Sequence, residues 1–211
     1  MAADEGTAGD RLGSALAAAA GVPLYDREAL LELARTLRPE LVIGDVEKLP
    51  QRVGSRMVAA ALGLASTTLA CSEAMRELRF REELVQLAGQ VLGEAARSSC
   101  VLVTSIGFAA LAGTPGAVHV RVRAPLEWRI AGYQRDALVD RHAAEKAVKH
   151  ADHQRHVLVK AMYRTDVEDD SHFSIVLDAS RFSIDRMVEM LLAAGAHRPA
   201  AEIMAERAAG W

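Results

Sequence analysis

Three short runs of β-branched residues, each followed by a segment of helical character, constrain the fold of this chain most. The runs are CVLVTS (100–105), AVHVRVRA (117–124) and FSIVLDA (173–179). Short apolar runs bounded by turn residues are typical of strands. Strands that alternate with helices favour a parallel sheet that is covered by helices on both faces. The pattern therefore predicts an α/β protein.

The segments around these runs have the composition and the end signals of helices. Residues 10–20 are rich in Ala and Leu, which favour helix, and Gly21 with the following Pro23 marks its end. REALLELARTL (27–37) and SIDRMVEMLLAA (183–194) repeat apolar residues at helical spacing. The second of these begins with a serine, a favourable capping residue. We therefore predict three helices here.

A longer charged segment lies between the second and third predicted strands. It begins at Pro125, which suits the first turn of a helix, and is predicted to stay helical to about Tyr163. The polar stretch RTDVEDDSH (164–172) that follows is predicted to be a loop, and VPLYD (22–26) to be extended. No internal repeat is apparent.

Composition excludes several classes of protein. The chain has 211 residues, of which 51% are hydrophobic and 25% charged, and a net charge of −3, so neither nucleic acid nor an anionic membrane is an expected partner. Cys71 and Cys100 are too few and too far apart to suggest disulfides or a zinc site, which favours a cytoplasmic location. No segment approaches the ~20 apolar residues that span a bilayer. We expect a single soluble domain.

The ends of the predicted strands indicate where a ligand would bind. In open parallel sheets, ligands bind beyond the carboxyl ends of the strands. The segments at these ends are Asp26, 105–108, 124–128 and 178–181. Functional residues are therefore expected among them.

A glycine-rich turn precedes the first predicted helix. Gly6 and Gly9 stand three residues apart, and a turn of this kind at a helix N-terminus can hold phosphate. The residues before it, MAADE, are poor strand formers, and the turn contains no lysine. The alternative is a tight turn that only starts a helix. Both interpretations stay open on the sequence alone.

Four segments together resemble the cytidylate kinase-like branch of the P-loop nucleoside monophosphate kinases. They are GTAGDRLGSALAAAAGVPLYDRE (6–28), VHVRVRAPLEWRI (118–130), ADHQRHVLVKAMYRTD (151–166) and FSIVLDASRFSIDRMVEMLL (173–192). Their order and spacing match the phosphate loop, the strand before the lid, the lid helix and the final strand and helix of that family. The resemblance covers about Gly6 to Ala194.

The resemblance implies a three-layer, P-loop kinase-like α/β fold, with a parallel sheet and helices on both faces. A single domain would span residues 1–195, with a helical insertion at about 52–97 and a lid at about 135–166. Residues 196–211 would form a C-terminal tail. The first strand is expected to be short or missing, because so little chain precedes the glycine turn.

The activity implied by the resemblance is transfer of the γ-phosphoryl group of ATP, with Mg²⁺, to a nucleoside monophosphate such as CMP or dCMP. Phosphate-binding residues would be Gly6, Thr7, Ala8, Gly9, Asp10 and Arg11. Acceptor-binding residues would be Asp26, Arg27, Ser105 and Gly107. The lid would contribute Lys149, Arg155, Arg164 and Asp166, and the catalytic residues would be Arg11 and Arg155. No protein residue is predicted to ligate a metal.

The chain departs from the family pattern where cations are needed. Asp10 stands where the family often has Arg, and Ile106 stands where an Arg contacts the acceptor phosphate. Asp4 and Glu5 are expected near the phosphates, where they would repel them. Because charge-assisted contacts to phosphate are hard to replace, phosphoryl transfer is expected to be weakened.

Each candidate also has a structural interpretation. Asp26 suits the N-cap of a helix, and residues 105–108 suit a packed strand-to-helix turn. Lys149, His153, His156 and Lys160 share a helix face that could close on phosphates or be solvated. His150, His153 and His156 step around a helix and do not converge on a metal. The alternative function is a non-catalytic, nucleotide-sensing or protein-binding pseudokinase, acting alone, as a homo-oligomer or beside an active paralogue.

Overall fold

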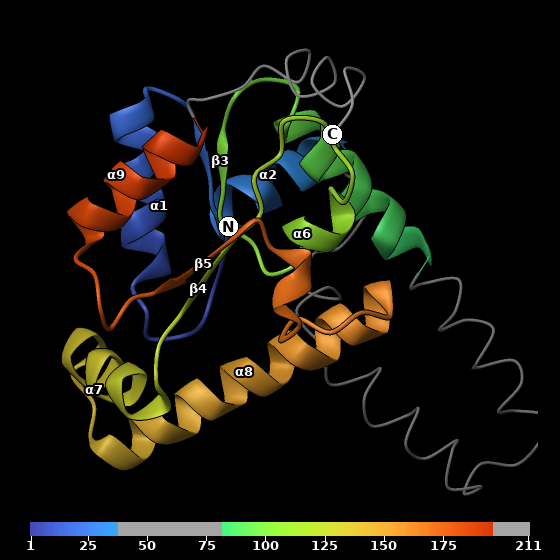
Figure 1. Cartoon of the computed structure of the whole chain (residues 1–211). Helices are drawn as coiled ribbons and strands as arrows, with labels where there is room; N and C mark the ends of the chain where they lie inside the picture. The colour runs from blue at the N-terminus through green and yellow to red at the C-terminus, as the bar shows by residue number, and fades with distance from the viewer. Residues whose placement is uncertain (38–81, 196–211) are drawn as a thin grey trace, which may run out of the picture.

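A computed structural model describes residues 1–37 and 82–195 of the chain. Most of the predicted insertion at 52–97, and the predicted tail at 196–211, lie outside these residues. The described part is a mixed α/β structure, in which helices cover both faces of a small parallel sheet (Figure 1). The predicted fold class is confirmed.

The sheet is built from short parallel strands. Their bounds are β1 Ala2–Ala3, β2 Leu24–Tyr25, β3 Val101–Leu102, β4 Val120–Arg123 and β5 Ile175–Asp178. β1 pairs with β4, β4 with β5, and β2 with β3, all in parallel. Two further hydrogen bonds join β3 to β1: Met1 N donates to Leu102 O at 2.6 Å, and Thr104 N donates to Met1 O at 3.0 Å. The spatial order is therefore β2-β3-β1-β4-β5.

The first strand is short, as the sequence predicted, and it lies in the middle of the sheet. Its small alanines fit there because neighbours crowd both sides; Ala2 is buried, and a Cβ on Gly9 would meet Ala3 Cβ at 2.2 Å. The ladder extends one residue further, since Asp4 N donates to Val122 O at 2.9 Å. The other predicted strands also form, but each is shorter than its apolar run.

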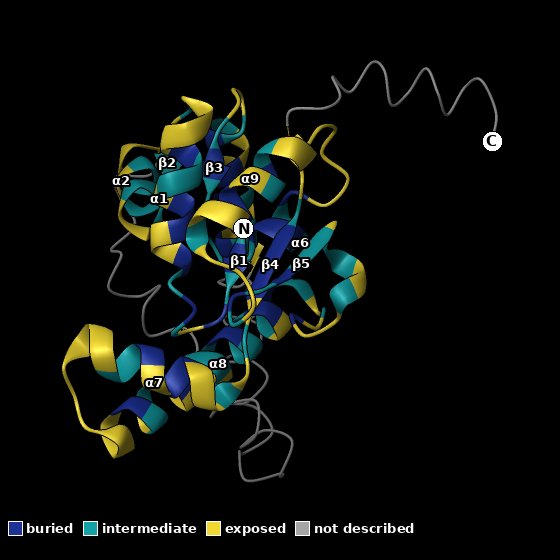
Figure 2. Cartoon of the chain, turned by 60° about the vertical axis from the view of Figure 1, so that its left-hand side comes forward, coloured by how far each residue is buried: buried dark blue, intermediate teal, exposed yellow. Residues whose placement is uncertain are grey.

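Helices α1 (Gly9–Ala20) and α9 (Ile184–Gly195) cover one face of the sheet (Figure 1). The side chains between them and the sheet form a buried cluster, and Figure 2 colours most of β4 as buried. Its members include Leu12, Val122, Leu177, Met187 and Leu191. Both predicted end signals are confirmed: Gly21 closes α1 with a φ of 65°, and Arg186 N donates to Ser183 Oγ at 3.3 Å. The apolar spacing of the sequence thus identified this core.

The other face carries α2 (Arg27–Leu37), a helix at 82–95 and the short α6 (Gly107–Ala110). The helix at 82–95 and α6 pack on the C-terminal half of α8. Leu84 packs with Met162 in one small cluster. Phe108 packs with Val159 in another.

The charged segment after Pro125 forms two helices, α7 (Leu126–Ala137) and α8 (Arg141–Tyr163). A single stretch to Tyr163 was predicted, and its end point is confirmed. The break arises at Leu138, which adopts a left-handed φ of 55°, and Asp140 then caps α8 by accepting from Ala143 N at 2.8 Å. Ile130 and Val148 pack between the two helices. Within the described residues, none of the helices combines the length and the apolar character needed to cross a membrane.

Candidate functional site

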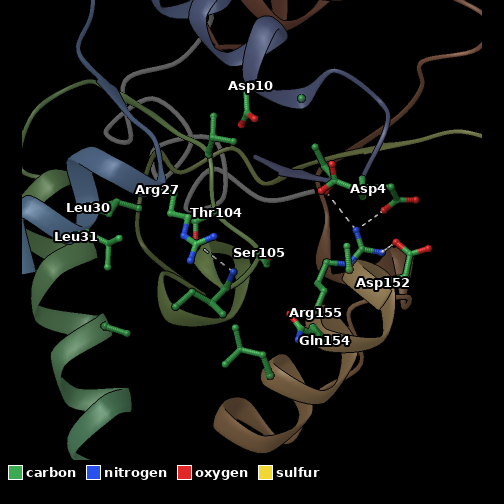
Figure 3. Close-up of a pocket in the computed structure, with 18 of the residues that line it drawn as sticks. Asp4, Asp10, Arg27, Leu30, Leu31, Thr104, Ser105, Asp152, Gln154 and Arg155 are labelled. Atoms are coloured by element: carbon green, nitrogen blue, oxygen red, sulfur yellow. Dashed lines mark hydrogen bonds and ion pairs between the residues drawn. The ribbon is translucent and has the colours of Figure 1, made fainter. Parts of the chain in front are cut away.

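A cleft of about 1070 Å³ lies beyond the carboxyl ends of the strands. One side is polar and consists of the turn before α1 together with the middle of α8. The other side is apolar and is contributed by α2, the helix at 82–95 and the end of α8. Figure 3 shows Asp4, Asp152 and Arg155 on one side and Arg27, Thr104 and Ser105 across from them. The cleft thus brings together segments that are far apart in the sequence.

The glycine turn adopts the backbone conformation that the sequence suggested. Gly6 has a φ of 84° and Ala8 a φ of 57°, both in the left-handed region that glycine tolerates best. A Cβ on Gly6 would lie 2.4 Å from the carbonyl oxygen of Arg129. No side chain caps α1, and the first N–H groups of a helix have no partner within it. The turn therefore presents backbone N–H groups at the cleft.

The side chains around this turn are mostly acidic. Glu5, Asp10 and Asp136 all line the cleft, and so does Arg11. Arg11 Nη2 lies 3.8 Å from Asp136 Oδ2, and both side chains are largely exposed. Burial raises the pKa of Glu5, and the carboxylates of Asp10 and Asp152 raise it further. The turn therefore offers anions little compensating positive charge.

Asp4 lines the cleft, and its carboxylate already has a partner there. That it repels phosphates stays a prediction; the carboxylate is buried and pairs with Arg155, whose Nη1 lies 2.5 Å from Asp4 Oδ1. A second guanidinium, that of Arg121, lies 3.9 Å away. Asp4 is therefore a buried partner of Arg155 at the wall of the cleft.

Arg155 is the most constrained of the predicted site residues. It lines the cleft although its side chain is only 8% exposed. Besides Asp4, its Nη1 donates to Ala3 O at 3.3 Å, and its Nη2 lies 3.1 Å from Glu168 and 3.6 Å from Asp152. Its Nε is buried without a partner among the described residues. Three carboxylates thus neutralise the guanidinium expected to serve the phosphates.

Two further buried arginines belong to the same network, and the sequence analysis did not identify them. Arg121 bonds to Glu168 and, at 3.0 Å, to Asp170. Arg129 bonds to Asp152 at 3.0 Å and to the carbonyl of Glu5 at 3.3 Å. One signal was available, because Arg121 alternates with valines in a strand of a sheet predicted to be covered on both faces, where a charge requires a partner.

The predicted acceptor residues separate into two groups. Arg27 and Ser105 line the cleft, whereas Asp26 and Gly107 are not among its lining residues. Asp26 Oδ1 accepts from Ala29 N at 3.0 Å, so this side chain caps α2. Ile106 packs against the clusters of Met162 and Phe108. The cleft thus keeps one cation, Arg27, and one hydroxyl from this group.

The predicted lid residues other than Arg155 do not line the cleft. Lys149 Nζ pairs with Glu145 at 2.6 Å on the exposed side of α8. Arg164 ends α8 with a left-handed φ of 55°. Asp166 accepts from Glu168 N at 2.9 Å and lies 3.6 Å from His156. Gln154, which the sequence analysis did not single out, lines the cleft beside Arg155.

The hydroxyl groups near the turn do not fit a protein-held Mg²⁺ site. Thr7 is 2% exposed and donates to the carbonyl of Asp4 at 2.6 Å. Ser14 donates to the carbonyl of Asp10 at 2.9 Å and does not line the cleft. Among the described residues, His, Cys, Asp and Glu side chains form no group that could hold a metal ion. Mg²⁺ accompanying ATP stays a prediction.

Comparison with known proteins places this arrangement in a family. The sequence model of the Cytidylate kinase-like family matches residues 2–181. The chain belongs to this family. The match spans the turn, both cleft walls within the described residues and the strand ends, and it confirms the family that the four segments resemble.

This cytidylate kinase-like protein also has similar solved structures. One is the crystal structure of an uncharacterized protein from Eubacterium ventriosum ATCC 27560, with a TM-score of 0.66 and 16% sequence identity. The alignment covers 93% of this chain and 96% of that one. At this identity the likeness establishes the shared fold. No curated protein matches the sequence.

Proposed function

We propose that this protein binds a nucleotide in the cleft and transfers phosphoryl groups from ATP to a nucleoside monophosphate such as CMP with weakened activity. The observation that carries the proposal is the composition of the cleft. Its lining unites the turn before α1, Arg27, Ser105 and Arg155, which lie in four separate segments of the sequence. All four segments lie within residues 2–181, which match the model of the family to which the chain belongs.

The polar side of the cleft supports phosphate binding. Backbone N–H groups at the start of α1 and the positive end of the helix dipole favour an anion there. Arg27 from α2 lies across the cleft and would contact the acceptor phosphate, with Ser105 as a hydrogen-bonding group. Two phosphate groups could thus approach one another between the turn and α2.

The apolar side supports binding of a nucleoside. Leucine, valine and methionine side chains form a wall against which a base can pack and lose contact with water. These residues are Leu30, Leu31, Leu84, Leu87, Val91, Leu158 and Met162. A ligand with a flat apolar part and an anionic part therefore matches both sides of the cleft.

The charges of the cleft support weak catalysis. Phosphoryl transfer depends on groups that neutralise charge at the transferring phosphate. Arg155 is held by Asp4 and Glu168, and Asp10 occupies the turn. Less positive charge is therefore available than an efficient phosphotransferase requires.

A second candidate function is nucleotide sensing without catalysis. The specific observation that favours it is the Asp4–Arg155 pair, because an arginine engaged in a buried ion pair is costly to redirect. In this case the protein would bind one nucleotide and transmit its presence to a partner.

The experiment that tests the proposal is calorimetric titration with CMP and with ATP–Mg²⁺, followed by a coupled assay of ADP formation. Arg27→Gln removes the cation that faces the cleft from α2. A matched control is Arg35→Gln on the same helix, whose exposed side chain pairs with Glu32. Because a hydrogen bond to a charged group is worth about 1.5–3 kcal/mol, Arg27→Gln should weaken CMP binding about tenfold or more.

The outcomes separate the two functions. Binding that is weakened by Arg27→Gln and retained by Arg35→Gln supports the cleft as the nucleotide site. CMP-dependent formation of ADP supports phosphoryl transfer, whereas binding without ADP formation supports sensing. Absence of binding by both CMP and ATP–Mg²⁺ to the unaltered protein overturns both proposals.

A further inference from the structure

The contact between Asp4 and Arg155 lies at the border between the protein interior and the cleft. Both residues line the cleft, yet each side chain is 8% exposed. Their atoms are 2.5 Å apart, and Figure 3 shows the pair beside the space that a ligand would fill. A charged group that is both buried and part of a cleft wall can interact with a ligand only by changing its present partner.

The other partners of Arg155 leave part of the guanidinium available. Its Nη2 is held by Glu168 at 3.1 Å, but Nη1 is held by Asp4 and the carbonyl of Ala3. The Nε atom is buried and has no partner within the described residues. Removal of the Asp4 charge would therefore free the N–H of Nη1 that now faces Asp4, while the bond from Nη1 to Ala3 O and the contact with Glu168 keep Arg155 in its place on α8.

Asp4 is the carboxylate best placed to compete with a ligand. Glu168 also pairs closely with Arg121, and Asp152 pairs with Arg129 at 2.8 Å, whereas the second guanidinium near Asp4, that of Arg121, lies farther away at 3.9 Å. Asp10 lines the same cleft but forms no ion pair or hydrogen bond with Arg155. An anion that reaches Arg155 from the turn must first displace the carboxylate of Asp4.

We propose that Asp4 is a specificity-determining residue that occupies Arg155 and so makes the cleft bind a nucleoside monophosphate more tightly than a nucleoside triphosphate, which leaves ATP weakly bound and accounts for the weakened activity. The proposal rests on the proposed nucleotide binding. A monophosphate can be held by Arg27 and the opposite side of the cleft without Arg155. A triphosphate extends further and needs an additional cation, because each added phosphate brings negative charge close to Asp4, Glu5 and Asp10.

The test compares CMP with CTP, so that the nucleoside stays constant, and adds inorganic pyrophosphate as a probe without a nucleoside. Dissociation constants are measured by calorimetry for the full chain and for Asp4→Asn. Asp4→Asn keeps the size of the side chain and removes its charge. We expect CTP and pyrophosphate to bind at least tenfold more tightly to the variant, which corresponds to about 1.4 kcal/mol, whereas CMP binding changes less than about threefold.

Three further variants identify the cause. Asp185→Asn, on the exposed start of α9, removes the same charge far from the cleft and should leave every constant unchanged. Asp10→Asn removes a cleft charge that does not contact Arg155 and should give a smaller gain for CTP. When Asp4→Asn is combined with Arg155→Gln, CTP and pyrophosphate should bind no more tightly than to the unaltered protein. This result would show that the tighter binding to Asp4→Asn depends on Arg155.

The buried pair of Asp4 with Arg155 also stabilises the fold, so Asp4→Asn could unfold the protein. In that case Asp152→Asn, whose side chain is 28% exposed, replaces it and should shift the CTP-to-CMP preference in the same direction by a smaller factor. The proposal is overturned if neither variant changes the preference, or if Asp10→Asn changes it as much as Asp4→Asn. If pyrophosphate responds as expected but no nucleotide binds, the role of Asp4 stands and the proposed nucleotide function fails.

Discussion

The two sides of α8 carry similar charged residues in opposite environments. On the side that faces the sheet, Arg155 pairs with Asp4 in the interior, and both side chains are 8% exposed. On the solvent side, Lys149 pairs with Glu145 at 2.6 Å, and Lys149 is 57% exposed. The exposed pair is screened by water and contributes little. The attraction between the buried charges is stronger, because the interior has a low dielectric constant. Removal of either partner would leave the other as an unpaired buried charge, which is destabilising.

This difference shows which charges hold the cleft in shape. The inner pair, Asp4 with Arg155, connects α8 to the residue that follows β1. Arg129 connects the same helix to α7 and to the turn before α1. The outer pair, Lys149 with Glu145, joins two residues of α8 that are one turn apart and so connects no other element to this helix. The inner charges therefore maintain the tertiary arrangement of the cleft, and the outer charges serve local helix stability and solubility.

The largest expected effect is that of Arg155→Met. Among the described residues, the substitution leaves the buried carboxylate of Asp4 with the guanidinium of Arg121, at 3.9 Å, as its one remaining cation. Breaking a buried pair in this way costs about 3–5 kcal/mol. Urea unfolding would measure the loss. Combining it with Asp4→Leu removes the orphaned charge and should recover much of that free energy; a double variant no more stable than Arg155→Met would refute this account of the inner side.

A smaller effect is expected from Glu5→Gln, and it should depend on pH. Burial and the neighbouring Asp10 and Asp152 raise the pKa of Glu5 above its ordinary value of 4.5. The folded state then binds the proton more tightly than the unfolded state, so stability is fully present below pH 4.5 and falls as the pH rises through the raised value. The glutamine of the variant does not ionise, so the variant does not lose stability in this pH range and should be more stable than the unaltered protein at pH 7.

The measurement is the free energy of unfolding at pH 4 and at pH 7. The two proteins should converge at the lower pH, and the gain at neutral pH should stay below about 1 kcal/mol because the side chain is partly screened by water. A destabilised variant at pH 7 would contradict the expected sign.

The smallest effect is expected from Lys149→Gln on the outer side. An exposed pair at this spacing stabilises a helix by about 0.3–0.5 kcal/mol. The change in unfolding free energy should therefore be within that range at low salt and vanish at high salt, as screening removes it. A loss as large as that of Arg155→Met would mean that the two sides of α8 do not differ as their exposure indicates.

Local signals in the sequence predicted much of the fold. The alternation of β-branched runs and helical segments identified the parallel sheet, and Gly21 and Ser183 identified two helix ends. The break at Leu138 was missed, because a left-handed leucine has no sequence signature comparable to that of glycine. Among the site residues, the glycine turn could be found because its conformation depends on local backbone freedom.

What the sequence by itself determined is the family, the α/β class, the short first strand and the shortage of cations at the turn. These follow from residue type, order and spacing along the chain. Only the tertiary structure decided that Asp4 neutralises Arg155 and that Arg121 and Arg129 complete the network. The partners in that network lie up to 151 positions apart, and the strength of a charge pair depends on its burial and on the distance between its atoms, which only the folded chain fixes.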